Sequence, residues 1–160
     1  MKLRWILPAL AIAIATAGLF VLAKSERDFI TALERSASAA SGSANPLITV
    51  SSVTDFGWDR LYIFSPYTPL DKIDAQLGYK WREAEKTHID TSDNFHLLVF
   101  VKNGSIVRHF KINRGIDFKG LEAGNVFLPG EDAFEVKSFG AAQDKRLTLF
   151  PKRKVQPVSN

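Results

Sequence analysis

The hydrophobic and polar positions divide this chain into a membrane-length apolar segment and a longer region of short alternating or periodic elements. Residues 6–23 form an apolar run without a charge, with Lys2 and Arg4 before it and Lys24 and Arg27 after it. At about 1.5 Å per residue, a helix of this length spans about 27 Å, close to the ~30 Å hydrocarbon core of a bilayer. The run therefore predicts export across a membrane or anchoring in it.

Two interpretations of this segment stay open. A signal peptide would be cleaved after one of two small-x-small triplets, 21–23 or 15–17. A retained signal anchor explains the length better, because the hydrophobic regions of ordinary signal peptides span about 7–15 residues. The positive flank before the run places the N-terminus in the cytoplasm and the rest of the chain outside. The alternative to both is a buried first helix of a cytosolic domain.

After the apolar run, the pattern changes twice before a folded domain is expected. Residues 24–35 predict a helix that continues outward from the membrane, since Phe29, Ile30 and Leu33 share one stripe. Residues 36–45 have no large apolar side chain and are typical of a flexible linker. The expected organisation is a signal anchor or signal peptide (1–23), a juxtamembrane helix and Ser/Ala/Gly linker (24–45), an extracytoplasmic α+β domain (46–151) and a basic flexible tail (152–160).

Within the expected domain, β-rich stretches alternate with one clear helix. The helix is predicted over 70–77, because Leu70, Ile73 and Leu77 share a face. Thr68 is expected to cap it, with Pro69 at the first helical position and Asp71 at the third, and Gly78 to stop it. A further helical turn is expected over 81–86. Strands are predicted over 47–53, 58–65, 95–101, 105–113, 125–128, 134–138 and 146–150.

The strongest turn signal is Asn103-Gly104, the pair favoured by type I′ hairpins. A two-residue turn makes the numbers of paired residues sum to 207. That register places Arg108 opposite Val99 on the core face, where we expect an ion pair rather than an anion site. The alternative is a position at the edge of the sheet with the guanidinium in water. The core face would hold Phe95, Leu97, Val99, Val101, Ile106, Phe110 and Ile112. The predicted fold is α+β with two layers: one antiparallel sheet carrying one short helix on a face, preceded by a transmembrane helix.

Composition narrows the classes of function. The chain has 160 residues and no cysteine, which excludes disulfides, zinc–thiolate sites, thiol nucleophiles and a lipidated cysteine. The formal net charge is +4. From residue 45 onward, sixteen Lys and Arg stand against fourteen Asp and Glu, a net charge of +2. Binding to nucleic acid requires basic residues clustered on one face, and a nearly balanced charge does not indicate such a cluster. We therefore expect no nucleic-acid partner.

Catalytic and metal-binding patterns are weak in this sequence. There is no Gly-x-Ser-x-Gly motif and no glycine-rich phosphate loop. In the sum-207 register His96 and His109 would be diagonal neighbours on one face, about 7 Å apart. With Asp93 and Asp90 they form the alternative metal site, although Lys111 opposite His96 would repel a cation. We expect ordinary sheet histidines there, and hence no cofactor and no metal.

Aromatic and basic residues in and after the second predicted strand are the remaining signal. Trp, Tyr and Arg dominate the hot spots of protein interfaces. Large aromatic residues also complete the cores of small domains, and Trp58 fits a core position better than the others. The tentative binding set is Trp58, Arg60, Tyr62, Tyr67, Trp81 and Arg82.

The segment 58–68, Trp-Asp-Arg-Leu-Tyr-Ile-Phe-Ser-Pro-Tyr-Thr, resembles a pattern in small exported bacterial proteins and lipoproteins of unknown function. In them a Trp-Asp-basic strand runs into Pro-Tyr, a short helix ending in Leu-Gly and a hairpin. The resemblance covers most of 56–118 and implies export or membrane anchoring. Residues 68–107 are also similar to the helix-then-sheet modules of outer-membrane assembly lipoproteins and of β-lactamase-inhibitor-type folds. The chain departs from the former because it lacks the cysteine that carries the lipid.

These observations favour a membrane-tethered, extracytoplasmic binding protein of the bacterial envelope without catalytic activity. An immunity-type inhibitor and an accessory subunit of an envelope complex are two versions of this hypothesis. The partners would be the cytoplasmic membrane, through residues 6–23, and an envelope protein. The alternatives are a metal-dependent or hydrolytic envelope enzyme that uses Asp93, His96 and His109, and a small-ligand binder.

Overall fold

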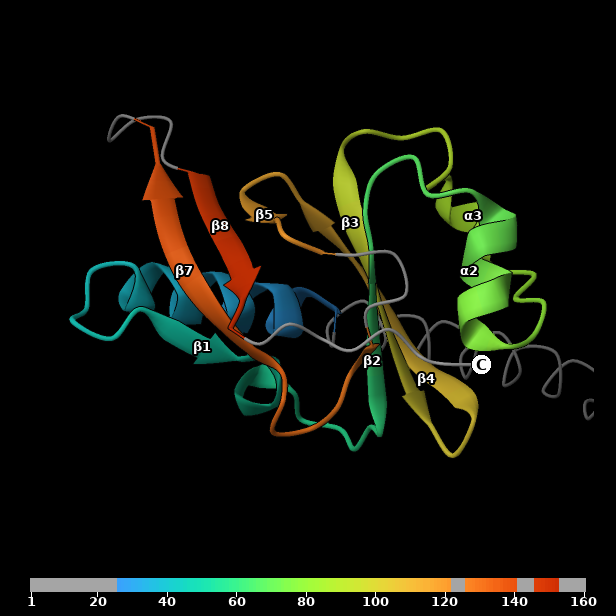
Figure 1. Cartoon of the computed structure of the whole chain (residues 1–160), viewed down its shortest axis with the longest axis horizontal. Helices are drawn as coiled ribbons and strands as arrows, with labels where there is room; N and C mark the ends of the chain where they lie inside the picture. Colours follow the sequence, from blue (N-terminus) through green and yellow to red (C-terminus); the bar gives the residue numbers. More distant parts are fainter. Residues whose placement is uncertain (1–25, 122–125, 141–145, 153–160) are drawn as a thin grey trace, which may run out of the picture.

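Two four-stranded sheets form the body of the protein (Figure 1). The computed structural model describes residues 26–121, 126–140 and 146–152. The predicted membrane segment over 6–23 and all of the predicted tail except Lys152 lie outside these residues. Within the described ranges, no helix has the length and apolar character needed to span a bilayer.

Each sheet combines strands that are far apart in the sequence. The first sheet has the order β1 (Leu47–Thr49), β7 (Ala133–Phe139), β8 (Arg146–Pro151) and β5 (Ile116–Phe118). The second has the order β4 (Ser105–Asn113), β3 (Phe95–Lys102), β2 (Arg60–Phe64) and β6 (Val126–Phe127). Neighbouring strands are antiparallel except β5 and β8, which are parallel. The helical segments are residues 26–40, η1 (Val50–Val53), α2 (Leu70–Leu77) and α3 (Ala84–Thr87).

The second sheet is covered on both faces, which gives the protein two cores. A central core joins the first sheet and the helix over 26–40 to one face of the second sheet, with Phe100 and Phe127 fully buried in it. An outer core joins the other face to α2 and α3, around Ile73 and Leu97. Figure 1 shows β7 and β8 on one side of β2–β4 and the two short helices on the other.

The predicted α+β class is confirmed, whereas the predicted single sheet with one covered face is wrong. Residues 61–64 of β2 are all buried, as expected for a strand covered on both faces. The hydrophobic pattern marks strands but not the partners they pair with. It also missed β5, whose three residues pair with β8 residues that lie 31 positions further along the chain.

The prediction of a flexible linker is wrong for residues 36–40, which form the last part of a helix over residues 26–40. Phe29, Leu33, Ala37 and Ala40 all face the central core, so this helix is part of the folded domain. Alanine is the best helix former, and its small side chain lets a helix lie close to a sheet. The sequence composition was therefore misread, and the domain does not begin near residue 46.

The predictions around α2 are partly right. Gly78 ends the helix in the left-handed conformation with a φ of 80°, and its N–H donates to the Asp74 carbonyl, as expected of this stop signal. Thr68 does not cap the helix, because Pro69 is the N-cap and no side chain bonds there. The Thr68 hydroxyl instead donates to the Ser65 carbonyl (2.6 Å) and closes the preceding turn.

The hairpin turn is confirmed, but its predicted register holds for only two pairs. Asn103 and Gly104 both have positive φ, as a type I′ turn requires. Lys102 pairs with Ser105 and Val101 with Ile106; the next pair is Phe100 with Arg108. Val107 is therefore an extra residue in β4. A β-bulge of this kind shifts the register by one and exchanges the two faces of everything beyond it.

Candidate functional site

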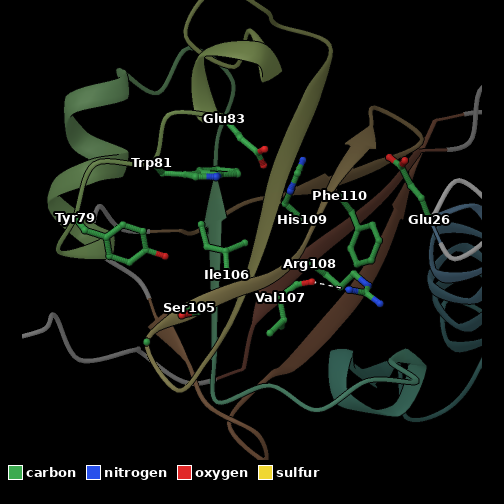
Figure 2. Close-up of a pocket in the computed structure, with 11 residues that line it drawn as sticks. Glu26, Tyr79, Trp81, Glu83, Ser105, Ile106, Val107, Arg108, His109 and Phe110 are labelled. Carbon is green, nitrogen blue, oxygen red and sulfur yellow. Dashed lines mark hydrogen bonds between the residues drawn. The ribbon is translucent and has the colours of Figure 1, made fainter. Parts of the chain in front are cut away.

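A groove of about 880 Å³ follows β4, which is an edge strand of the second sheet (Figure 2). Among the residues that the structure describes, β4 pairs only with β3. We call this cavity the edge groove. Its lining consists of Glu26, Tyr79, Trp81, Glu83 and the β4 side from Gly104 to Phe110.

One wall of the edge groove follows the turn that ends α2. Gly78 redirects the chain, and the Trp81 N–H donates to Asp74 Oδ1 (2.8 Å), which holds the wall against the helix. Trp81 is buried in the outer core and meets the His109 ring edge-to-face, with 5.2 Å between the centroids. Figure 2 shows Glu83 and Trp81 grouped with His109. This wall thus presents an indole and a carboxylate to the groove.

The opposite wall begins at the first turn of the helix over 26–40. Phe29 stacks on Phe110 of β4, with ring centroids 4.3 Å apart. Glu26 lies almost one turn before Phe29 and reaches the groove. This wall is therefore held in place by the helix whose apolar stripe, which includes Phe29, was predicted from the sequence.

Arg108 lies on the same side of β4 as Phe110. Its Nη1 donates to the Val107 carbonyl (2.8 Å), and its guanidinium carbon lies 5.7 Å from the centroid of the Phe56 ring. The expected ion pair is not present among the described residues, where no carboxylate lies within 4.0 Å of Arg108. Arg108 Nε is buried and has no hydrogen-bond partner there. The prediction that Arg108 lies opposite Val99 is also wrong, because the bulge places it opposite Phe100.

Burial shifts the pKa values of two side chains that line the edge groove, His109 and Tyr79. Burial lowers the pKa of His109, and the nearby carboxylates of Glu83 and Glu26 oppose that change without reversing it. Burial raises the pKa of Tyr79, and a backbone hydrogen bond with Ile106 opposes the rise. Both rings are therefore uncharged at neutral pH, and they can donate or accept hydrogen bonds without carrying charge.

The alternative metal site does not assemble. His96 faces the central-core side of the second sheet, whereas the bulge turns His109 to the outer-core side. The Asp93 carboxylate bonds Arg114 Nη2 at 3.2 Å, and Arg114 Nε donates to the Asp93 carbonyl. No group of three or more potential ligands that could hold a metal ion occurs in the described part of the chain. Asp90, the fourth residue considered, is half-buried in the loop before Asp93.

His96 instead forms a pair with Asp117, which the sequence analysis did not consider. His96 Nε2 and Asp117 Oδ1 are 2.8 Å apart, and Lys119 Nζ lies 3.7 Å from the other carboxylate oxygen. Burial lowers the pKa of His96, although Asp117 acts in the opposite direction. A cavity of about 230 Å³ lies here, lined by Pro66, His96, Arg114, Asp117 and Arg146. None of the described residues that line this cavity is a Ser, Thr or Cys that could serve the pair as a nucleophile.

The tentative binding set does not form one surface. Trp58 lies in the central core, as its better fit to a core position suggested, and Tyr62 lies in the outer core. Arg60 and Arg82 are exposed, and Trp81 belongs to the edge groove. Tyr67 is 60% exposed with a φ of 62°, an uncommon conformation for a bulky residue.

Glu26, Tyr79, Glu83 and His109 were not predicted to lie together. His109 was noticed only as a possible ligand, because the predicted register put it beside His96. No local pattern brings a helix start, a turn after α2 and an edge strand together. Only the bulge and the packing of both cores do so.

Comparisons of the chain with protein-family models, with curated proteins and with solved structures found no match.

Proposed function

We propose that this protein is a non-catalytic binding protein of the bacterial envelope that binds another protein through the edge groove. In this proposal residues 6–23 hold it in the cytoplasmic membrane, with the N-terminus in the cytoplasm and the folded domain outside. An immunity-type inhibitor and an accessory subunit of an envelope complex are the two versions that fit a small tethered domain.

The edge groove is the observation that carries the proposal. Its volume of about 880 Å³ is in the range of binding cavities, and it follows a strand whose outer side has no partner among the described residues. Trp81, Tyr79 and Arg108 line it, and these residue types contribute most to protein interfaces. An open strand edge between such side chains supports recognition of a polypeptide.

The geometry gives no support to the alternative envelope enzyme. Asp93, His96 and His109 were its proposed residues, and they have separate partners on different faces of the sheet. A catalytic metal would need three of them to converge on one ion. The binding function is therefore the one that the site supports best.

Photo-crosslinking in cells tests the binding function. A photoreactive amino acid would replace Ser105 or Glu83, which are exposed and line the edge groove, or Ala75 or Ser138, which are exposed elsewhere. We expect a discrete crosslinked protein from the two groove positions and none from the two controls. Equal adducts at all four positions, or adducts at the controls alone, would contradict the proposal.

A reporter enzyme that is active only outside the cytoplasm tests the topology. Fused after residue 160, it should be active, and it should stay with the membrane fraction if the anchor is retained. Activity in the soluble extracytoplasmic fraction would indicate cleavage of residues 1–23. An inactive fusion in the cytosol would refute the proposed location.

A further inference from the structure

Arg108 is a cation that has no carboxylate partner within the described residues, although its guanidinium lies over the Phe56 ring. Of its guanidinium nitrogens, Nη1 donates to the neighbouring Val107 carbonyl, and Nε is buried without a partner. Leaving a buried N–H of a charged group unpaired costs free energy, and a carboxylate is the group that best matches a guanidinium. The position of Arg108 in the edge groove gives an incoming carboxylate access to it.

The other cations of this strand and its end are already engaged. Lys111 Nζ lies 4.9 Å from the centroid of the Phe95 ring. Arg114 forms its ion pair and hydrogen bond with Asp93. Arg108 and Lys111 both lie over an aromatic ring, but only Arg108 has a buried N–H without a hydrogen-bond partner among the described residues. A partner carboxylate would therefore form its most stabilising contact at Arg108.

The backbone of β4 offers matching hydrogen-bond groups. The Val101 carbonyl accepts from the Asp59 N–H, so Val101 directs its backbone groups toward the β2 side. Every second residue of β3 does the same, because an antiparallel strand alternates the direction of its groups. The β4 partners of these residues are Ile106, His109 and Lys111, which therefore direct their N–H and C=O groups away from the sheet. The stretch from His109 onward, beyond the bulge, is where an added strand would pair.

We infer that the edge groove binds an extended segment of the partner protein as an additional strand on β4, with an Asp or Glu side chain of that segment against Arg108. This inference rests on the proposed binding function. Glu83 and Glu26 flank the neighbouring His109 and would repel an acidic residue placed there. The charges of the groove thus restrict the acidic residue to the Arg108 position.

A matched set of peptides tests the inference with the full chain in detergent. Each peptide has seven residues, blocked ends and alternating threonine and valine, with glutamate, glutamine or lysine at the centre. We expect the glutamate peptide to bind about tenfold more tightly than the glutamine peptide, as one added charge-assisted hydrogen bond predicts, and the lysine peptide to bind most weakly. Fluorescence anisotropy of labelled peptides measures the three affinities.

Three substitutions at two positions of β4 locate the effect. Arg108→Gln should remove the preference for glutamate, whereas Lys111→Gln removes a charge of equal sign and should keep it. Arg108→Lys should retain part of the preference, and far-UV circular dichroism with thermal unfolding checks that all three variants fold.

Three outcomes would overturn the inference: no peptide binding, equal affinity for the three peptides, or a preference that survives Arg108→Gln. A concentration-dependent dimer that excludes the peptides would assign the groove to a second copy of this chain and overturn it as well. If groove crosslinks form in cells but glutamate gives no preference, the acidic segment is refuted while the binding function stands.

Discussion

At the scale of single residues, Asp132 illustrates how a buried charge is held. It is fully buried, and its Oδ2 and Oδ1 accept hydrogen bonds from the Ser51 and Gly130 N–H groups. Its own carbonyl accepts from the Val50 N–H (3.2 Å). The side chain therefore fastens η1 to the turn before β7, and its charge is compensated by backbone dipoles.

Replacing Asp132 should destabilise the fold strongly. Asp132→Ala leaves two backbone N–H groups without their acceptor, so the free energy of unfolding should fall by about 3 kcal/mol. Urea unfolding followed by circular dichroism measures the loss. Asp55→Ala, at an exposed carboxylate, is the control and should change stability by less than about 0.5 kcal/mol. Equal effects of the two substitutions would refute this role of Asp132.

The buried His96 and the half-buried His109 should make the fold sensitive to mild acid. Burial lowers the pKa of His96 and of His109 below the ordinary value of 6.5. As the pH falls below about 6.5, the unfolded chain binds protons that the folded chain does not, so the free energy of unfolding decreases. The stabilising contribution is complete above that pH and is lost as the pH approaches the lowered values of the folded state.

Urea midpoints at about pH 7.5 and pH 5.5 would test this dependence. His109→Gln should reduce the difference between the two midpoints, whereas the same substitution at the exposed His88 should leave it unchanged. A difference that His109→Gln does not alter, or a midpoint that rises toward acid, would contradict the assignment.

At the scale of elements, the bulge at Val107 decides what β4 presents to each side. Without it, His109 would share a face with His96; with it, His109 meets Trp81, and Phe110 enters the central core beneath Phe29. A single additional residue therefore determines which side chains line the edge groove. Sequence alternation alone could not reveal this, since both faces of the strand carry apolar residues.

Deletion of Val107 should be tolerated. The pairs on either side, Val101 with Ile106 and Phe100 with Arg108, can become consecutive without turning any other side chain to the opposite face. The cost should be no more than about 1–2 kcal/mol, the burial of a half-exposed valine. Cooperative urea unfolding and a dispersed NMR spectrum would check the outcome.

Deletion of His109 is the matched control. It would either rotate Phe110 and Ile112 out of the central core or remove the bulge, which turns Arg108 to the outer-core side and Val107 toward the central core. We therefore expect a clearly larger loss of stability than for the deletion of Val107. If the deletion of Val107 lowered the stability as much as the deletion of His109, Val107 would not be the extra residue that β4 can lose without changing its packing.

At the scale of the whole molecule, the helix over 26–40 belongs to the fold. Leu33 and Ala37 are fully buried in the central core, and Phe29 contacts both Phe100 and Phe110. Residues 36–40, the first half of the expected linker, therefore belong to the folded domain.

Truncation tests this boundary. A chain that begins at residue 26 should unfold cooperatively, whereas a chain that begins at residue 46 should not fold, because it lacks the large side chains that the helix buries. In the longer chain, Leu33→Ala should cost about 3 kcal/mol and Glu34→Ala, at an exposed neighbour, almost nothing. A stable fold from residue 46 would refute the role of the helix.

Local signals predicted those features that depend on a few neighbouring residues. Gly78 has no side chain to oppose a left-handed conformation, and Asn103-Gly104 favours a tight turn whatever surrounds it. The features that failed depend on distant partners. Ala37 was assigned to a linker because a small side chain contributes little to the hydrophobic pattern. In the structure it is fully buried, since its helix packs against the central core.

The sequence by itself determined the α+β class, the position of α2, the β3–β4 turn and the expectation of a membrane segment, because each follows from short-range periodicity or from turn and transfer preferences. The tertiary structure decided the two-sheet architecture, the register beyond Val107, the inclusion of the helix over 26–40 and the meeting of Trp81, Arg108 and His109 around one groove. These depend on which apolar faces find each other, and that choice is made by the packing of the complete chain.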